Sequence, residues 1–242
     1  MSWQEEYLDR YYRSRPGYVD GTTEYWEMVR AHAAPDGEVL ELGCGPANRT
    51  SEFLAETFAA VDGLDIDEAC RDNPSVRRAY VYDGKQWPVA DETYDAIVAN
   101  YVLEHVEHPT ELVREIKRVL RPDGVFVFRA PNRWHYVSLA SRLTPHFVHE
   151  KLANRLRNFS DDAQDPYPTF YRMNSAGALR RLFASEGFVQ QEMRAIEKEP
   201  YYGLSLKPLF LLFMLYERIV NSTAALAWAR ANLLGVFRKP AS

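Results

Sequence analysis

The residues whose types and spacing point most clearly to chemistry are Gly43, Gly45 and Asp65. The two glycines end the apolar run 38–42, and a helix-compatible segment follows them. Glycine lets the backbone turn sharply and approach a ligand closely, and the helix after the turn would present free N–H groups to an anionic group. Asp65 ends the next apolar run, twenty residues past Gly45. A carboxylate at that position can hold ribose hydroxyls, so the pattern predicts a nucleotide-type site.

Three stretches resemble, in order and spacing, the motifs of the class I S-adenosylmethionine-dependent methyltransferases. They are Val39–Pro46, similar to motif I; Leu64–Asp67, similar to motif II; and Tyr94–Asn100 with Leu103–Val106, similar to the fourth-strand motif. The likeness covers residues 36–132 and resumes at 174–198. Any one motif could arise by chance, but the ordered set is specific. The layout resembles bacterial methyltransferases of glycan or natural-product pathways, although no residue identifies the acceptor.

The resemblance implies S-adenosyl-L-methionine as the cofactor. Glu41 and the glycine turn would bind its methionine end, Asp65 would accept hydrogen bonds from the ribose diol, and Ile66 would pack against the adenine. Asp83, which precedes Gly84, would contact the adenine amino group or else simply form a turn. The expected cofactor-binding residues are Glu41, Gly43, Cys44, Gly45, Asp65, Ile66, Asp83, Gly84, Asn100 and Tyr101.

Catalytic candidates follow from the tip of the expected fourth strand, where Asn100 and Tyr101 should meet the sulfonium and the incoming nucleophile. Methyl transfer is an in-line displacement that positioning alone can promote, but a hydroxyl nucleophile also benefits from a general base such as histidine. His105 and His135 are the catalytic candidates by location, and the absence of any proton transfer stays open as the alternative. Candidates for binding an acidic or sugar-like acceptor are Arg129, Arg133 and Trp134.

The sequence disfavours two other kinds of site, a dinucleotide site and a metal site. A nicotinamide dinucleotide site requires a third glycine at position 48, where the chain has Asn48. The pairs His105/His108 and His146/His149 have spacing compatible with metal ligands, but neither has cysteines or a clear carboxylate set beside it. We therefore expect neither a dinucleotide nor a metal.

Alternating short strands and helices predict an α/β fold with a mostly parallel sheet and helices on both faces. By resemblance this is the Rossmann-like class I methyltransferase sheet, with an antiparallel last strand and with helices inserted after strand 5 and between the last two strands. The expected strands are 38–42, 61–66, 79–82, 96–99, 125–128, 188–197 and 233–239. The expected helices are 22–34, 50–60, 110–120, 206–220 and 223–231. Thr22 or Thr23 would cap the first of these helices. One further helix would be capped by Asn174 or Ser175 and would end at Gly187.

We expect one methyltransferase domain over residues 1–242, without a second domain or internal repeat. Its expected parts are aromatic-rich N-terminal lid helices at 1–34, a cofactor-binding core at 36–132, a substrate-recognition insertion at 132–172 with an exposed loop at Asp161–Pro166, and an apolar helical insertion at 199–232. Ligands in open α/β sheets bind outside the carboxyl ends of the strands, which is why the insertion after strand 5 is assigned to the substrate.

Bulk properties narrow the location and the partners. The formal charge of −5 argues against non-specific nucleic-acid binding, and two cysteines make no disulfide framework. Residues 1–6 lack the features of a signal peptide, so we expect a cytoplasmic protein. The longest strongly apolar run, 209–216, is far shorter than the ~20 residues of a membrane-spanning helix. Residues 203–231 are a candidate for peripheral membrane contact or for a homodimer interface.

The function expected from these observations is O-methylation of a small-molecule, glycan or lipid-linked acceptor by S-adenosyl-L-methionine. Two alternatives stay open. One is an N-methyltransferase that acts on a small amine. The other is a non-catalytic cofactor-binding module that works as an interaction protein through its apolar tail.

Overall fold

A computed structural model of the protein describes residues 2–143, 167–200 and 206–241. The expected pair His146/His149 and the expected loop Asp161–Pro166 lie outside the described residues. The chain divides into two compact units. The sheet unit contains residues 25–131, 169–194 and 233–242, and the helical unit contains residues 1–24, 132–168 and 195–232.

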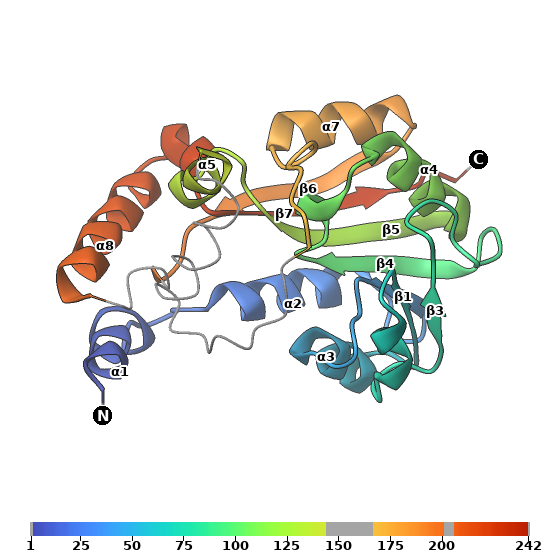
Figure 1. Ribbon diagram of the computed structural model, residues 1–242, viewed down its shortest axis with the longest axis horizontal. Coiled ribbons are helices and arrows are strands. Elements are labelled where there is room, and N and C mark those ends of the chain that lie inside the picture. The colour runs from blue at the N-terminus through green and yellow to red at the C-terminus, as the bar shows by residue number, and fades with distance from the viewer. Residues whose placement is uncertain (1, 144–166, 201–205, 242) are drawn as a thin grey trace. The chain divides into compact units, whose positions relative to one another are not determined.

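Within the described residues, seven strands form one sheet in the order β3-β2-β1-β4-β5-β7-β6 (Figure 1). They are β1 Glu38–Leu42, β2 Ala60–Asp65, β3 Ala79–Val81, β4 Tyr94–Asn100, β5 Leu120–Pro131, β6 Val189–Ile196 and β7 Asn232–Arg238. Strands β1 to β5 are parallel, and β7 is antiparallel between β5 and β6. The expected α/β sheet with an antiparallel last strand is confirmed.

The central strands are buried on both faces. All four residues of Val39–Leu42 in β1 are buried, and so are all four of Ala96–Ala99 in β4. Strands covered by helices on both sides carry continuous apolar runs instead of an alternating pattern. This is why the apolar runs of the sequence predicted these strands within a residue or two.

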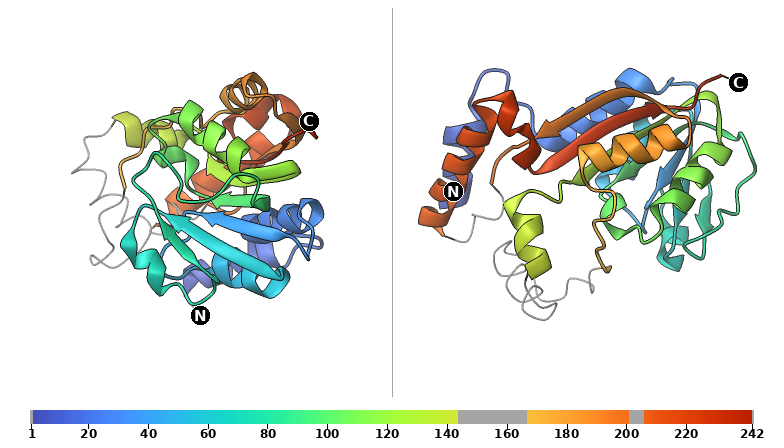
Figure 2. Two further views of the ribbon diagram at one scale, coloured as in Figure 1. Left: turned by 90° about the vertical axis from the view of Figure 1, so that its right-hand side faces the viewer. Right: turned by 90° about the horizontal axis from the view of Figure 1, so that it is seen from above.

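Helices of the sheet unit cover both faces of the sheet, as Figure 2 shows. α2 (Gly21–His32) and α3 (Arg49–Thr57) lie together, with the rings of Trp26 and Phe53 stacked at 4.8 Å. α4 (Pro109–Val119) and α7 (Ala176–Ser185) lie together on the opposite face. Two short 3-10 helices, Glu68–Asp72 and Leu103–His105, follow β2 and β4.

Helix α2 is capped differently from the prediction. The carboxylate of Asp20 accepts hydrogen bonds from the backbone N–H groups of Thr22 at 2.8 Å and Thr23 at 3.1 Å. The predicted cap at Thr22 or Thr23 is therefore wrong, because Asp20 already satisfies the free N–H groups of the first turn. The predicted cap of α7 is confirmed, since the Ser175 hydroxyl accepts from the backbone N–H of Ala178.

Strand β5 begins earlier than predicted and contains an irregularity. Tyr94 pairs with Leu120, whereas Ala96 pairs with Val125, so the four residues 121–124 of β5 lie opposite the single residue Asp95 of β4. Pro122 has no N–H for the ladder, and Asp123 has a positive φ of 63°. The chain therefore pairs with β4 on both sides of residues 121–124.

The helical unit packs around aromatic rings. Its helices are α1 (Trp3–Leu8), a π-helical turn (Asp9–Arg13), α5 (Tyr136–Leu143), α8 (Lys207–Asn221) and a 3-10 helix (Ala224–Ala229). Leu8, Tyr12 and Phe210 form its buried core, and the partly buried side chains around them are Trp3, Tyr7, Tyr11, Tyr18 and Met214. The aromatic N-terminal segment thus packs against α8, and its role as a lid stays a prediction. The predicted second tail helix is shorter than expected and of the 3-10 type.

None of the helices in the described residues has the length and apolar character needed to cross a bilayer.

Candidate functional site

The glycine turn after β1 has a backbone that only glycine accepts easily. Gly43 and Gly45 have φ angles of +78° and +52°. A Cβ atom on Gly43 would lie 2.4 Å from Cγ2 of Val102, closer than any real contact. Val102 therefore packs directly on Gly43, whereas a Cβ atom on Gly45 would have no atom within 4 Å, so the turn is open to a ligand's approach at Gly45.

Asp65 meets this turn because β1 and β2 are paired neighbours, with Leu42 opposite Leu64. Its Oδ2 accepts a hydrogen bond from the backbone N–H of Gly45 at 2.9 Å, and its Oδ1 accepts from that of Asp67 at 3.0 Å. Each carboxylate oxygen has a further lone pair for a ligand. The structure therefore brings together the glycines and the carboxylate that the sequence singled out.

Glu41 is buried beside the turn. Its Oε2 accepts from the Ser51 hydroxyl at 2.6 Å, and its Oε1 lies 3.4 Å from the side-chain amide of Asn48. Burial raises the pKa of Glu41 to about 7, although these two hydrogen bonds act in the opposite direction. Asn48, which stands where a dinucleotide site would have its third glycine, is the N-cap of α3.

The tip of β4 is connected to the start of α3 and to β5. Asn100 donates through Nδ2 to the Thr50 hydroxyl at 2.9 Å and accepts through Oδ1 from Nε of Arg129 at 2.8 Å. The Arg129 guanidinium is buried and lies 4.7 Å from the ring centre of Tyr101, whose φ is +57°. The sequence placed Asn100 and Tyr101 here, but it did not show that Arg129 joins them. Acceptor binding by Arg129 stays a prediction.

The residues expected near the adenine are exposed. Ile66 is 48% exposed, which leaves its side chain free to pack against a ligand. Asp83 accepts hydrogen bonds from the backbone N–H groups of Lys85 and Gln86, and these bonds hold its pKa below the usual value. Asp83 therefore does form a turn, with Gly84 at a φ of +81°, and its contact with adenine stays a prediction.

The two histidine candidates lie in different units. His105 is in the sheet unit at the carboxyl end of β4; its side chain is 32% exposed, and Nε2 lies 3.9 Å from Oε1 of Glu104. His135 is in the helical unit, where it is buried between Tyr136 and Tyr216 with Nε2 3.5 Å from Oε1 of Glu197. Neither role in catalysis is tested by this geometry. Across the described residues there is no cluster of three metal-ligating side chains.

Glu104 is a buried acid that the sequence did not single out. Its backbone carbonyl accepts from the N–H groups of Phe170 and Tyr171, and its Oε2 has no hydrogen-bond partner among the described residues. Burial raises the pKa of Glu104 from 4.5 to about 8. Burial therefore favours the protonated form of this side chain.

This burial predicts a pH-dependent stability. Between about pH 4.5 and 8, the unfolded chain releases the Glu104 proton while the folded chain keeps it, so the free energy of unfolding falls as pH rises. In the Glu104→Gln variant, that fall should be smaller by about 1–3 kcal/mol. Urea unfolding at pH 5 and pH 8 measures the difference, with Glu111→Gln on the exposed face of α4 as the matched control. Equal pH dependence in both variants would contradict the prediction.

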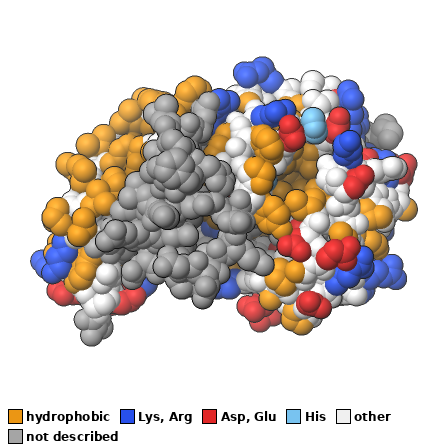
Figure 3. Space-filling view, in the orientation of Figure 1, with side chains coloured by type: hydrophobic (Ala, Val, Ile, Leu, Met, Phe, Trp, Pro, Cys, Tyr) orange, Lys and Arg blue, Asp and Glu red, His pale blue; other side chains and the backbone are white. Residues whose placement is uncertain are grey.

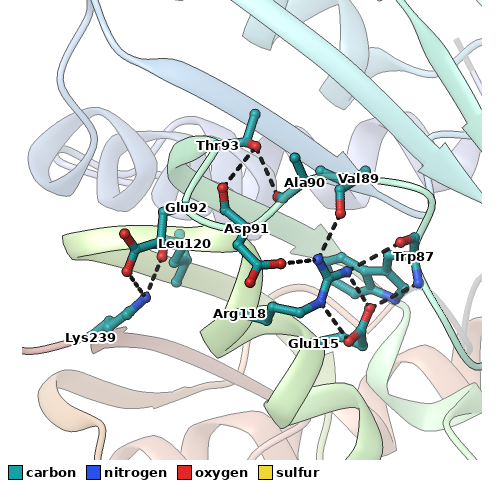
Figure 4. A network of polar contacts seen from close by, with 10 residues as sticks. All are labelled: Trp87, Val89, Ala90, Asp91, Glu92, Thr93, Glu115, Arg118, Leu120 and Lys239. Atoms are coloured by element: carbon teal, nitrogen blue, oxygen red, sulfur yellow. Dashed lines mark hydrogen bonds and ion pairs between the residues drawn. The ribbon is translucent and has the colours of Figure 1, made fainter.

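A cleft of about 430 Å³ lies away from the glycine turn, at the amino end of β4, and is lined by Asp91, Glu92, Arg114, Lys117, Arg118 and Lys239. Figure 4 shows that Arg118 and Lys239 bind neighbouring carboxylates and backbone carbonyls. Arg118 contacts the carboxylates of Glu115 and Asp91 and the carbonyl oxygens of Trp87 and Val89. The Lys239 ammonium donates to Glu92 and to the Leu120 carbonyl. These contacts stabilise the turn before β4.

Comparison with known proteins gives a consistent family. A family described as a methyltransferase domain matches residues 12–192. A probable S-adenosylmethionine-dependent methyltransferase of Mycolicibacterium smegmatis is 36% identical over 132 residues, 50% of each chain. A ubiquinone biosynthesis O-methyltransferase of Actinobacillus pleuropneumoniae is 31% identical over 110 residues, 40% of this chain and 46% of the relative. The chain thus spans about half the length of the curated relatives that it matches.

Solved structures agree on the fold. Geranyl diphosphate C-methyltransferase from Streptomyces coelicolor, determined with S-adenosyl-L-homocysteine, superposes with a TM-score of 0.59 at 16% identity. The match covers 90% of this chain and 79% of that one. At this identity the similarity concerns the fold alone.

Proposed function

The chain belongs to the methyltransferase-domain family and is an S-adenosylmethionine-dependent enzyme, and from this we propose that it methylates a hydroxyl oxygen of a small-molecule, glycan or lipid-linked acceptor. S-adenosylmethionine, when bound, supplies an electrophilic methyl group on its sulfonium. The remaining question is what this chain's own residues contribute.

The proposed cofactor site consists of the glycine turn and Asp65. The left-handed glycines let the cofactor approach the backbone of the turn closely, which suits its charged amino-acid end. The Asp65 carboxylate sits at the carboxyl end of β2 and can accept two hydrogen bonds from a diol. Both features fit the cofactor of the family.

The choice of a hydroxyl acceptor is carried by His105. When a hydroxyl oxygen forms its bond to the methyl carbon, the carbon–sulfur bond breaks and the hydroxyl proton must leave. His105 is partly exposed in the short 3-10 helix that follows β4, so its imidazole is a candidate to accept that proton. The similarity to a ubiquinone biosynthesis O-methyltransferase supports the same choice. His135, which is buried, is the second candidate.

The test is transfer of a labelled methyl group from S-adenosylmethionine to matched acceptors: a soluble catechol, the same catechol with an isoprenoid tail, and the corresponding aromatic amine. Mass spectrometry of the products should locate the label on oxygen. His105→Ala should lower kcat and remove an ionisation from the pH profile of kcat, with His108→Ala as the control. Label only on the amine nitrogen would contradict the proposal and favour the N-methyltransferase alternative.

An apolar face of α8 supports a lipid-linked acceptor. Pro208, Leu211, Leu212, Leu215 and Ile219 are all exposed and share one side of the helix, since they recur every three or four residues. Figure 3 shows hydrophobic side chains gathered over this part of the molecule.

The surroundings of this face suit a lipid surface. The 3-10 helix that contacts α8 carries Trp228, which is 60% exposed, and tryptophan favours the membrane–water interface. Lys207 is exposed at the start of α8 beside the apolar face, where its charge can reach anionic headgroups. We propose that the α8 face lies on the bilayer that holds the acceptor.

Introducing charge into this face should abolish membrane contact. The double variant Leu212→Glu, Leu215→Glu should bind phosphatidylcholine–phosphatidylglycerol vesicles at least about 100-fold more weakly than the wild type in a sedimentation assay, because the two leucines together contribute about 3–6 kcal/mol when buried. Ala225→Glu, an exposed substitution on the neighbouring 3-10 helix, is the control. The lipid proposal fails if the wild type does not bind vesicles and is a dimer in sedimentation equilibrium, while the double variant is a monomer. The face would then be a homodimer interface.

A further inference from the structure

Asn73 contacts the glycine turn from a distant part of the sequence. It follows the 3-10 helix after β2 and is buried. Its Nδ2 lies 3.0 Å from the carbonyl oxygen of Cys44, 3.1 Å from that of Gly45 and 3.0 Å from the Ser51 hydroxyl. Its Oδ1 accepts from the backbone N–H of Ser75 at 3.0 Å. One side-chain amide thus reaches two successive carbonyls of the turn and the first turn of α3.

A second amide shares two of these partners. Nδ2 of Asn48 lies 2.6 Å from the Cys44 carbonyl oxygen and 2.8 Å from the Ser51 hydroxyl. That hydroxyl donates to Oε2 of Glu41 at 2.6 Å. The two asparagines, Ser51 and Glu41 therefore form one network beside the turn, and its buried bonds, those of Ser51 to Glu41 and of Asn73 to Cys44 and Ser51, are strengthened by their low-dielectric surroundings.

The network acts on one peptide plane in particular. In a trans peptide, the C=O of Cys44 and the N–H of Gly45 point in opposite directions, and the structure has no cis peptide among the described residues. The two asparagine amides hold the C=O, and Asp65 holds the N–H at 2.9 Å. Because glycine adopts many conformations, this plane would be free to rotate without such partners.

We propose that Asn73 is a positioning residue for the methionine end of the cofactor. By binding the inward-facing carbonyls of Cys44 and Gly45, it fixes the outward face of the turn that receives the amino-acid group. The proposal rests on the cofactor site proposed above. It assigns to Asn73 no contact with the cofactor itself.

This role makes a prediction about ligand selectivity. Asp65 keeps its own hydrogen bond from the Asp67 N–H, which does not depend on Asn73. Loss of the Asn73 amide should therefore affect the amino-acid end of a ligand and spare its ribose. S-adenosylhomocysteine has both parts, whereas adenosine has only the ribose and the base.

The experiment is calorimetric titration of Asn73→Ala and Asn73→Asp with both ligands. Asn73→Asp has the same shape and can still accept from Ser75, but it can no longer donate to the two carbonyls. Both variants should bind S-adenosylhomocysteine about tenfold more weakly and adenosine less than twofold more weakly. Asn174→Ala is the matched control, since Asn174 is also buried and also donates to a carbonyl, that of Pro131. It should leave the ratio of the two affinities unchanged.

Three outcomes would overturn the inference. Equal loss for both ligands would mean that Asn73 supports the site as a whole, and unchanged binding would mean that it has no such role. Failure of both variants to fold, judged by circular dichroism and thermal unfolding, would make Asn73 a residue of the fold instead. If the wild type itself does not bind S-adenosylhomocysteine, the proposed cofactor site is wrong, which is a separate result.

Discussion

Asp65→Ala should weaken the binding of S-adenosylhomocysteine by about 100-fold. The carboxylate would lose two charge-assisted hydrogen bonds to the ribose diol, each worth about 1.5–3 kcal/mol. It would also release the backbone N–H of Gly45, which Asp65 holds at 2.9 Å. Titration calorimetry at fixed pH and salt measures the change directly.

Two further variants separate charge from general disturbance. Asp65→Asn keeps one acceptor oxygen but no charge, so its loss should be intermediate, about tenfold. Asp67→Ala changes a neighbouring carboxylate that accepts from the Ala69 N–H and caps the 3-10 helix. It should change the affinity less than twofold. Equal effects of Asp65→Ala and Asp67→Ala would refute the ribose assignment.

Gly43→Ala should lower the free energy of unfolding by about 2–4 kcal/mol, which is a large part of the stability of a typical domain. Two costs combine. The φ of +78° is unfavourable for alanine by about 1–2 kcal/mol, and the new Cβ would lie 2.4 Å from Cγ2 of Val102. Because the turn would have to move, binding of S-adenosylhomocysteine should be lost as well.

Gly187→Ala is the matched control for Gly43→Ala. Gly187 has a similar φ of +85°, but the nearest atom to an added Cβ is Nζ of Lys117 at 3.5 Å, an ordinary contact. Its cost should be only about 1 kcal/mol. Adding Val102→Ala to Gly43→Ala should recover part of the lost stability, although Val102→Ala alone should destabilise the protein. Chemical unfolding of all four variants measures the coupling energy between positions 43 and 102. If the effects of the two substitutions are additive, Val102 does not contact a Cβ atom at position 43.

The sequence by itself determined the elements that obey local rules. Strands β1 and β4 were predictable because burial on both faces favours a mostly apolar run, which only the buried Glu41 interrupts in β1. Helix α4 was predictable because its buried residues, Leu112, Val113, Ile116 and Val119, follow the helical period. Gly43 and Asp65 were identifiable because a sharp turn needs glycine and because the ends of neighbouring parallel strands meet at one edge.

Some local details still differed from their prediction, since several residues compete for one role. Asp20 caps α2 in place of Thr22 or Thr23, because its carboxylate reaches both free N–H groups. Strand β5 pairs with β4 on both sides of residues 121–124, because pairing depends on the partner strand as well as on these residues.

Only the tertiary structure showed which distant segments meet. Asn73 reaches Gly45 across 28 positions of sequence, and Tyr12 reaches Glu217 across 205. The sequence did not single out Asn73, and it assigned the N-terminal aromatics to lid helices without indicating their partner in α8. Contacts of this kind leave no periodic trace in the chain, because a single side-chain amide or ring suffices to make them once the strands and helices are in place. The backbone of the site could therefore be predicted from the sequence, whereas the side chains that hold this backbone in position could not.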